Sequence, residues 1–193
     1  MKHLKHDDLL SLEAYARERP AFRARVLAHK QARVVHLESH LTFVFEDRLT
    51  IQYQVQEILR VERIFEPAGI AEELEAYNPL IPDGSNLKAT MLIEYPDAEE
   101  RARKLVELHG IERRVVLQVG DTAPIAAVAD EDLPRSTDTK TSAVHFLRFE
   151  LTREQVAAWR DGAEVALSID HPACGVRQSL SASARTALAT DFD

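Results

Sequence analysis

Three polar side chains occupy positions where the sequence pattern calls for apolar ones. Glu62 falls on the apolar stripe of a helix predicted over residues 51–64, at about 100° per residue. His145 and His171 each alternate with apolar residues in a predicted strand, so both imidazoles take the inward register. One carboxylate and two imidazoles that meet inside a fold form a ligand set suited to Fe(II), Mn(II) or Zn(II). The pattern therefore predicts a metal centre built from distant parts of the chain.

Two further residues extend this candidate set. His40 begins a predicted strand over residues 40–46, and Glu57 lies on the same helix as Glu62, so each is a further ligand or an orienting partner of one. Two other interpretations stay open. The histidines can be core residues bonded to backbone, with Glu62 past its helix end or paired with an arginine. Alternatively, a buried Glu62 with a raised pKa can act as a metal-free acid or base.

Established catalytic and cofactor motifs are missing from the sequence. It has 6 glycines and neither a GxGxxG nor a P-loop pattern, so no nucleotide cofactor is expected. The one cysteine, Cys174, excludes an internal disulfide and a CxxC motif. It is a poor candidate nucleophile, because Pro172 separates it from His171, and we expect a small buried residue at a strand end.

Composition narrows the class of protein and of partner. The chain has 193 residues, of which 45% are hydrophobic, and this predicts a single domain with a substantial core. A net charge of −8 argues against nucleic acid as the main partner. No apolar run approaches the roughly 20 residues of a membrane span, and no signal peptide is evident. We therefore expect a cytoplasmic protein.

The order of predicted elements indicates an α+β fold. A helix-rich half covers residues 1–84 and a sheet-rich half covers residues 85–193. In the first half, Asp7 or Asp8 is expected to cap one helix and Pro20 to open a second, followed by a hairpin and the helix that Asp47 caps. In the second half, strands with short connections predict a mainly antiparallel sheet, on which the N-terminal helices pack, with two or three further helices. Thr152 is expected to cap one of these helices and Gly110 to end another. The polar residues 129–142 are expected to form a mobile loop, with their acidic run facing solvent.

Several stretches resemble a bacterial family of unknown function. They cover residues 11–64, AYNPLIP at 76–82, SAVHFLRFEL at 142–151 and IDHPA at 169–173. Genes of that family tend to lie beside genes for rubrerythrin-like and iron–sulfur oxidoreductase proteins, which implies a place near non-haem iron and oxidative-stress chemistry. The residues that match recurring family positions are His40, Glu46, Gln56, Glu57, Arg60, Glu62, His145 and His171. Cys174 departs from the pattern, which has an aromatic residue there.

Two functional hypotheses follow. In the first, the chain is a metal-binding accessory or oxidoreductase component in oxidative-stress metabolism, with Glu62, His145 and His171 as ligands of iron, manganese or zinc. In the second, it is a non-catalytic interaction module that binds a rubrerythrin-like or iron–sulfur partner, or a second copy of itself. That module would use a sheet edge or the N-terminal helices as its contact surface.

Overall fold

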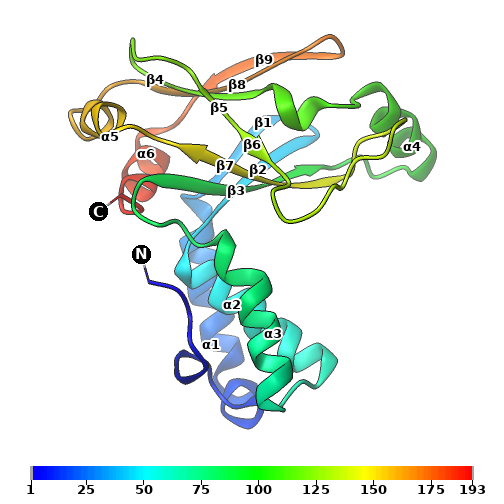
Figure 1. Cartoon of the computed structure of the whole chain (residues 1–193), viewed down its shortest axis with the longest axis vertical. Coiled ribbons are helices and arrows are strands. Elements are labelled where there is room, and N and C mark those ends of the chain that lie inside the picture. Colours follow the sequence, from blue (N-terminus) through cyan, green and yellow to red (C-terminus); the bar gives the residue numbers. More distant parts are fainter. Residues whose placement is uncertain (1, 193) are drawn as a thin grey trace.

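The computed structural model describes residues 2–192 and confirms the α+β class (Figure 1). Its α-helices are α1 (Leu12–Gln31), α2 (Arg48–Glu62), α3 (Pro67–Tyr77), α4 (Ala98–Glu107), α5 (Arg153–Arg160) and α6 (Ala182–Ala189). Its short 3-10 turns are η1 (His6–Asp8), η2 (Asn78–Leu80) and η3 (Ile111–Arg114). Its strands are β1 (Val34–Glu38), β2 (Leu41–Glu46), β3 (Asn86–Ile93), β4 (Val115–Val119), β5 (Ile125–Ala126), β6 (Val128–Ala129), β7 (Val144–Glu150), β8 (Val165–His171) and β9 (Cys174–Ser179).

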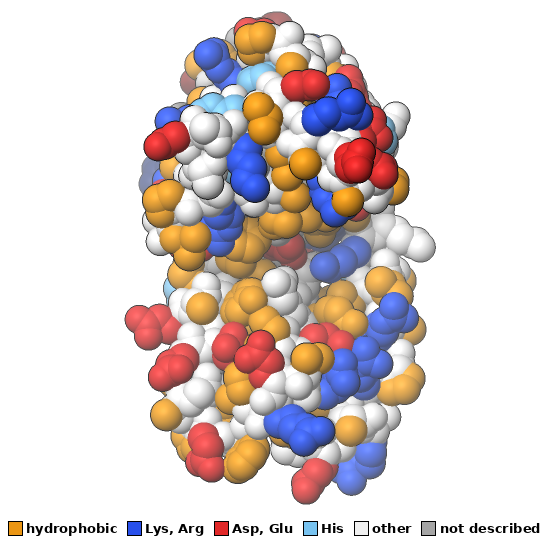
Figure 2. Space-filling model, turned by 90° about the vertical axis from the view of Figure 1, so that its right-hand side faces the viewer, with side chains coloured by type: hydrophobic (Ala, Val, Ile, Leu, Met, Phe, Trp, Pro, Cys, Tyr) orange, Lys and Arg blue, Asp and Glu red, His pale blue; other side chains and the backbone are white. Residues whose placement is uncertain are grey.

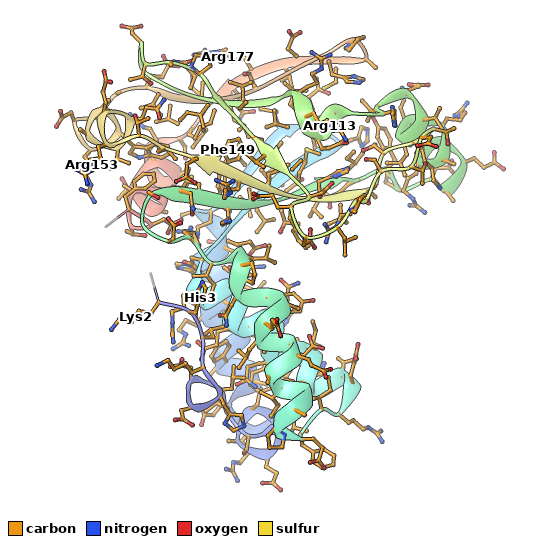
Figure 3. The ribbon with its side chains drawn as sticks, in the orientation of Figure 1. Lys2, His3, Arg113, Phe149, Arg153 and Arg177 are labelled. Carbon is orange, nitrogen blue, oxygen red and sulfur yellow. The ribbon has the colours of Figure 1, made fainter. Side chains whose placement is uncertain are left out.

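The strands form two antiparallel sheets that face each other. One has the order β1-β2-β3-β7-β6 and the other β5-β4-β8-β9. Alternate residues of each strand point into the space between them, as the period of two predicts, and Phe149 on β7 is one such residue (Figure 3). The sequence predicted one sheet, but enough apolar strand faces exist to build a sandwich with a single large core.

Helices α1, α2 and α3 form an arm that projects from the sandwich (Figure 1). They pack on one another around two smaller apolar clusters, and α2 meets the first sheet at β2. One cluster includes Ile51, Val55 and Leu59 of α2, and the other joins Tyr15, Phe22 and Val26 of α1. The fold therefore has two parts with separate cores, and the hairpin β1–β2 carries the chain from the arm into the first sheet.

Helix α1 runs unbroken through Pro20, whereas the sequence predicted a new helix there. Proline removes one helical N–H, but Pro20 faces solvent and the apolar face of α1 continues past it onto α2. Its N-cap is Ser11, whose hydroxyl accepts from the Ala14 amide, so the prediction of Asp7 or Asp8 as cap is also wrong. The caps predicted at Asp47 for α2 and Thr152 for α5 are confirmed, each within a reciprocal capping box.

A fully buried arginine joins the arm to the sandwich. The Arg33 guanidinium donates to the carbonyls of Phe45, Glu46 and Ala187 and pairs with the Asp191 carboxylate. Burial raises the pKa of Asp191 to about 6, even though Arg33 acts in the opposite direction. Because Arg33 follows the end of α1, these bonds connect the arm to the end of β2 and to the C-terminal helix α6.

Within residues 2–192, every helix is too short or too polar to cross a lipid bilayer.

Candidate functional site

The three predicted ligands are not brought together. Glu62 is exposed at the last residue of α2 in the arm, while His145 and His171 lie on β7 and β8 in the two sheets of the sandwich (Figure 1). The expected inward orientation of Glu62 is wrong, because Arg63 adopts a left-handed conformation that ends α2 there. Among residues 2–192, no group of three histidine, cysteine, aspartate or glutamate side chains is arranged to hold a metal ion. The three predicted ligands therefore do not meet, and metal binding stays a prediction for which the described residues offer no set of ligands.

His171 and His40 are held by backbone groups at turns. His171 ends β8, where Nε2 lies 3.1 Å from the His109 carbonyl oxygen and Nδ1 accepts from the Ala173 amide at 3.2 Å. His40 lies in the β1–β2 turn instead of within a strand, and its Nδ1 lies 2.8 Å from the Glu94 carbonyl oxygen. Its ring also stacks on Tyr95 at 4.1 Å. Both imidazoles thus have the local structural role that the sequence left open as an alternative.

Glu57 binds an arginine and a tyrosine within the arm. The Arg19 Nε and Nη2 atoms donate to its two oxygens at 2.7 and 2.9 Å, and the Tyr15 hydroxyl donates at 2.7 Å. Arg19 lowers the pKa of Glu57 to about 2. With both oxygens engaged, Glu57 joins α1 to α2 and is not oriented toward an empty site.

His145 alone occupies a buried polar network, beneath residues 130–143. Its Nδ1 lies 2.6 Å from Asp130 Oδ2, and its Nε2 lies 2.7 Å from Thr141 Oγ1. Thr141 Oγ1 in turn donates to Glu112 Oε2 at 3.0 Å. The imidazole is fully buried, so the inward register predicted for β7 is confirmed.

Hydrogen bonds link the His145 ring to two carboxylates, one directly and one through a hydroxyl. Nδ1 lies against the Asp130 carboxylate, and Nε2 lies against Thr141, whose hydroxyl donates to Glu112. Burial raises the pKa of Glu112, but its own amide, the His145 charge and two hydroxyls outweigh burial and lower it overall. The imidazole therefore lies between two carboxylates, and the network connects the polar loop to β7.

Sequence reasoning missed Asp130 and Glu112. Asp130 was assigned to a solvated acidic run, yet it is a buried partner with a left-handed backbone, φ 52°. Glu112 lies in η3 and is 3% exposed. The available signal was the histidine itself, because an imidazole in an apolar register needs a partner for each nitrogen.

The tip of the arm carries an apolar groove. Its cavity volume is about 620 Å³, and its apolar lining includes Leu9, Leu10, Leu12, Leu59, Ile64, Phe65 and Ile70. Two large apolar side chains stand exposed at this tip: Val61 is 64% exposed and Phe65 is 68% exposed. Side chains of this size are normally buried, so their exposure at one place marks a surface that can be covered.

Two amide side chains hold the N-terminal segment in place as one wall of this groove. Gln56 on α2 accepts from the Leu10 amide at 2.6 Å and donates to the Leu10 carbonyl at 3.2 Å. Asn78 makes the same pair of bonds with Leu4, at 2.7 and 3.0 Å. Because each amide satisfies both backbone groups of its partner, the segment lies against the arm without being part of a sheet.

Comparisons with known proteins place this fold in a family. The family model described as "Protein of unknown function (DUF3501)" matches residues 3–192. The chain belongs to the DUF3501 family. A solved structure, described as a novel protein of unknown function from Burkholderia pseudomallei K96243, is 49% identical, with a TM-score of 0.95 and full coverage of both chains. No curated protein matches the sequence.

Several acidic residues lie in or near the segments that form the groove of this DUF3501 protein. Glu13 lines it, and Glu62 and Glu66 flank the exposed segment that carries Phe65, with Arg63 as the basic residue of the same turn. Burial raises the pKa of Glu73 on α3, and the nearby charges of Glu62 and Glu72 raise it further. This crowding of carboxylates gives the arm tip a negative field beside its apolar surface.

Proposed function

We propose that this protein is a non-catalytic interaction module that binds a basic amphipathic helix of another protein in the groove at the arm tip. The single observation that carries the proposal is the exposure of Phe65 on an apolar groove of about 620 Å³. A groove of this kind accepts the apolar face of a helix, whose side chains recur every three or four residues. Covering an exposed phenylalanine or valine contributes about 1.5–3 kcal/mol.

The charges around the groove determine whether the partner helix should carry basic or acidic residues beside its apolar stripe. Glu13, Glu62 and Glu66 outnumber Arg63, so lysine or arginine beside the partner's apolar stripe is attracted and acidic residues are repelled. This complementarity distinguishes a basic partner helix from a second copy of this chain, whose own arm tip is acidic. Glu62, predicted as a metal ligand, takes part in this proposal as a rim charge.

The arm is built to present such a surface. Its helices project from the sandwich (Figure 1), with Arg33 bound at the sandwich end and Glu57 joining α1 to α2 within the arm. The family resemblance adds an expected class of partner, a rubrerythrin-like or iron–sulfur protein. Metal-dependent activity is a separate hypothesis, and the interaction proposal does not require it.

The direct test uses a synthetic helical peptide as the probe. A leucine–lysine amphipathic peptide labelled with a fluorophore is titrated with the wild-type protein, with Phe65→Ser and with Leu27→Ser, which changes another exposed apolar residue on the arm. We expect Phe65→Ser to weaken binding by roughly tenfold or more and Leu27→Ser to leave it unchanged. Equal affinities for the three proteins, or equal affinity for a leucine–glutamate peptide, would contradict the proposal.

A second test addresses the partner class. A rubrerythrin-like or iron–sulfur protein from the same genome is co-expressed with each variant, and the complex is measured by size-exclusion chromatography with and without chelator. We expect a complex that survives chelation and is lost with Phe65→Ser. A complex that Phe65→Ser does not affect would place the contact elsewhere.

A further inference from the structure

The N-terminal segment, residues 4–10, forms one wall of the groove at the arm tip. Leu9 and Leu10 line the groove from this segment, and Phe65 lines it from the turn after α2. Figure 1 shows the segment running along the arm toward the tip. In Figure 2 the arm is the lower half of the molecule, and hydrophobic side chains lie exposed on it between acidic and basic ones. The groove is therefore complete only while the segment lies against the arm.

Polar side chains at every fourth position of α2 hold this segment. Arg48, Gln52 and Gln56 recur at this spacing, so they lie on the same side of the helix. Arg48 pairs with the Asp8 carboxylate at 2.8 Å, and Gln52 Nε2 donates to the Asp8 carbonyl at 2.6 Å. Gln56 completes the row through its two bonds to the backbone of Leu10. The contacts that hold the segment are thus largely polar.

The apolar contacts of the segment are few. Leu4 is the buried side chain among residues 4–10, and it packs in the cluster that α2 and α3 share. Residues 5–7 are exposed, and residues 8–10 are half-buried. Segments with few buried apolar contacts open at a lower free-energy cost than the core around them, because ordering them costs conformational entropy that little burial offsets. The N-terminal wall is therefore the part of the groove that is most readily released.

We infer that the N-terminal segment is a releasable wall, so that its docking on the arm and the binding of a partner helix stabilise each other. This inference rests on the function proposed above. A helix that contacts Leu9 and Leu10 binds molecules in which the segment is docked, so its apparent affinity falls with the docked fraction. By linkage, a bound helix also holds the segment in place. Gln56 is then a positioning residue, because it holds the wall without lining the groove.

The first test removes the side-chain amide that holds Leu10. Gln56→Met keeps the length of the side chain but leaves the Leu10 N–H and carbonyl without these partners, and Gln178→Met makes the same change at an exposed position of β9. The labelled leucine–lysine peptide is titrated with both variants and with wild type. We expect Gln56→Met to weaken binding roughly tenfold or more, which corresponds to a docked fraction of about one-tenth or less, and Gln178→Met to match wild type.

The second test uses the wild-type protein, so it does not depend on the folding of a variant. The Leu4 amide donates to Asn78 Oδ1 at 2.7 Å, and neither residue lines the groove, so hydrogen exchange at this amide reports docking of the segment without contact with the peptide. With the peptide at ten times its dissociation constant, we expect this exchange to slow about tenfold. The Leu180 amide, which donates to the Val165 carbonyl in the sandwich, is the control and is expected to stay unchanged.

The outcomes separate this inference from the proposed function. Peptide binding that Phe65→Ser weakens, with exchange at the Leu4 amide unaffected by the peptide, would keep the proposed function and overturn the releasable wall. The wall is also overturned if Gln56→Met binds the peptide as wild type does, whether or not its Leu4 amide has lost protection. Failure of the wild-type protein to bind the peptide would overturn both.

Discussion

The His145 network predicts a large and specific loss of stability when the imidazole is removed. In His145→Phe, the Asp130 carboxylate, whose side chain is 9% exposed, loses a hydrogen bond of 2.6 Å, and Thr141 loses one of 2.7 Å. Removing one partner of a buried hydrogen-bonded group costs about 1–3 kcal/mol, and Asp130 keeps the Phe146 amide and an ion pair with Arg135 at 3.4 Å. We therefore expect a cost in this range from His145→Phe at pH 7.

A double-mutant cycle separates the pair from the packing of the ring. His145→Phe and Asp130→Asn each break the same contact, so the double variant is expected to be more stable than the sum of the single losses predicts, by about 1–3 kcal/mol. His36→Phe is the matched control, since His36 is an exposed histidine on β1, and its effect is expected within about 0.5 kcal/mol.

The assay is urea unfolding of the four proteins and the control, combined with hydrogen exchange. The Asp130 amide donates to the Phe146 carbonyl and the Thr141 amide to the Leu105 carbonyl, both at 2.9 Å. Loss of the imidazole should release the loop, so these two amides lose protection before the core strands do. A stability change below about 0.5 kcal/mol, or strictly additive losses, would refute the assignment of His145 as the buried link between Asp130 and Glu112.

Two further predictions concern the arm. Glu57→Gln is expected to cost about 1–2 kcal/mol at pH 7, after allowance for solvent screening. The folded-state pKa of Glu57 is depressed to about 2, so its contribution is full above the ordinary value of 4.5 and is lost as pH falls toward 2. Urea unfolding at several pH values should show the gap between wild type and variant narrowing on acidification, and a constant gap would argue against the charge effect. Arg33→Met is expected to cost about 3–5 kcal/mol, and adding Asp191→Asn should recover part of it, because the buried carboxylate is then no longer unpaired. Thermal unfolding of the single and double variants checks this prediction. A double variant that is less stable than Arg33→Met alone contradicts it.

Local sequence signals located most elements of the fold. Asp47 and Thr152 capped their helices as predicted, because a cap requires only residues within one turn. Gly110 follows α4 with a φ of 83°, a conformation that favours glycine, as its position in the sequence indicated. The prediction of a helix start at Pro20 was wrong, because the continuity of α1 depends on its contact with α2 and not on its own residues alone.

The candidate site was harder to predict because its parts come from distant segments. The period of two correctly turned His145 inward, but it did not show that Asp130 and Glu112 would meet the ring from a loop and a 3-10 turn. Glu62 matched the helical stripe, yet α2 ends at that residue, where Arg63 takes a left-handed conformation and the helical periodicity stops.

The sequence by itself determined the α+β class, the inward register of β7 and the cap of α2 at Asp47, because these follow from short-range periodicity and capping. Only the tertiary structure decided that the predicted ligands lie apart, that His145 lies between two carboxylates, and that Phe65 is exposed at the arm tip. The physical reason is that burial and pairing are properties of contacts between distant segments, and a one-dimensional pattern specifies which face a side chain takes but not what it meets there.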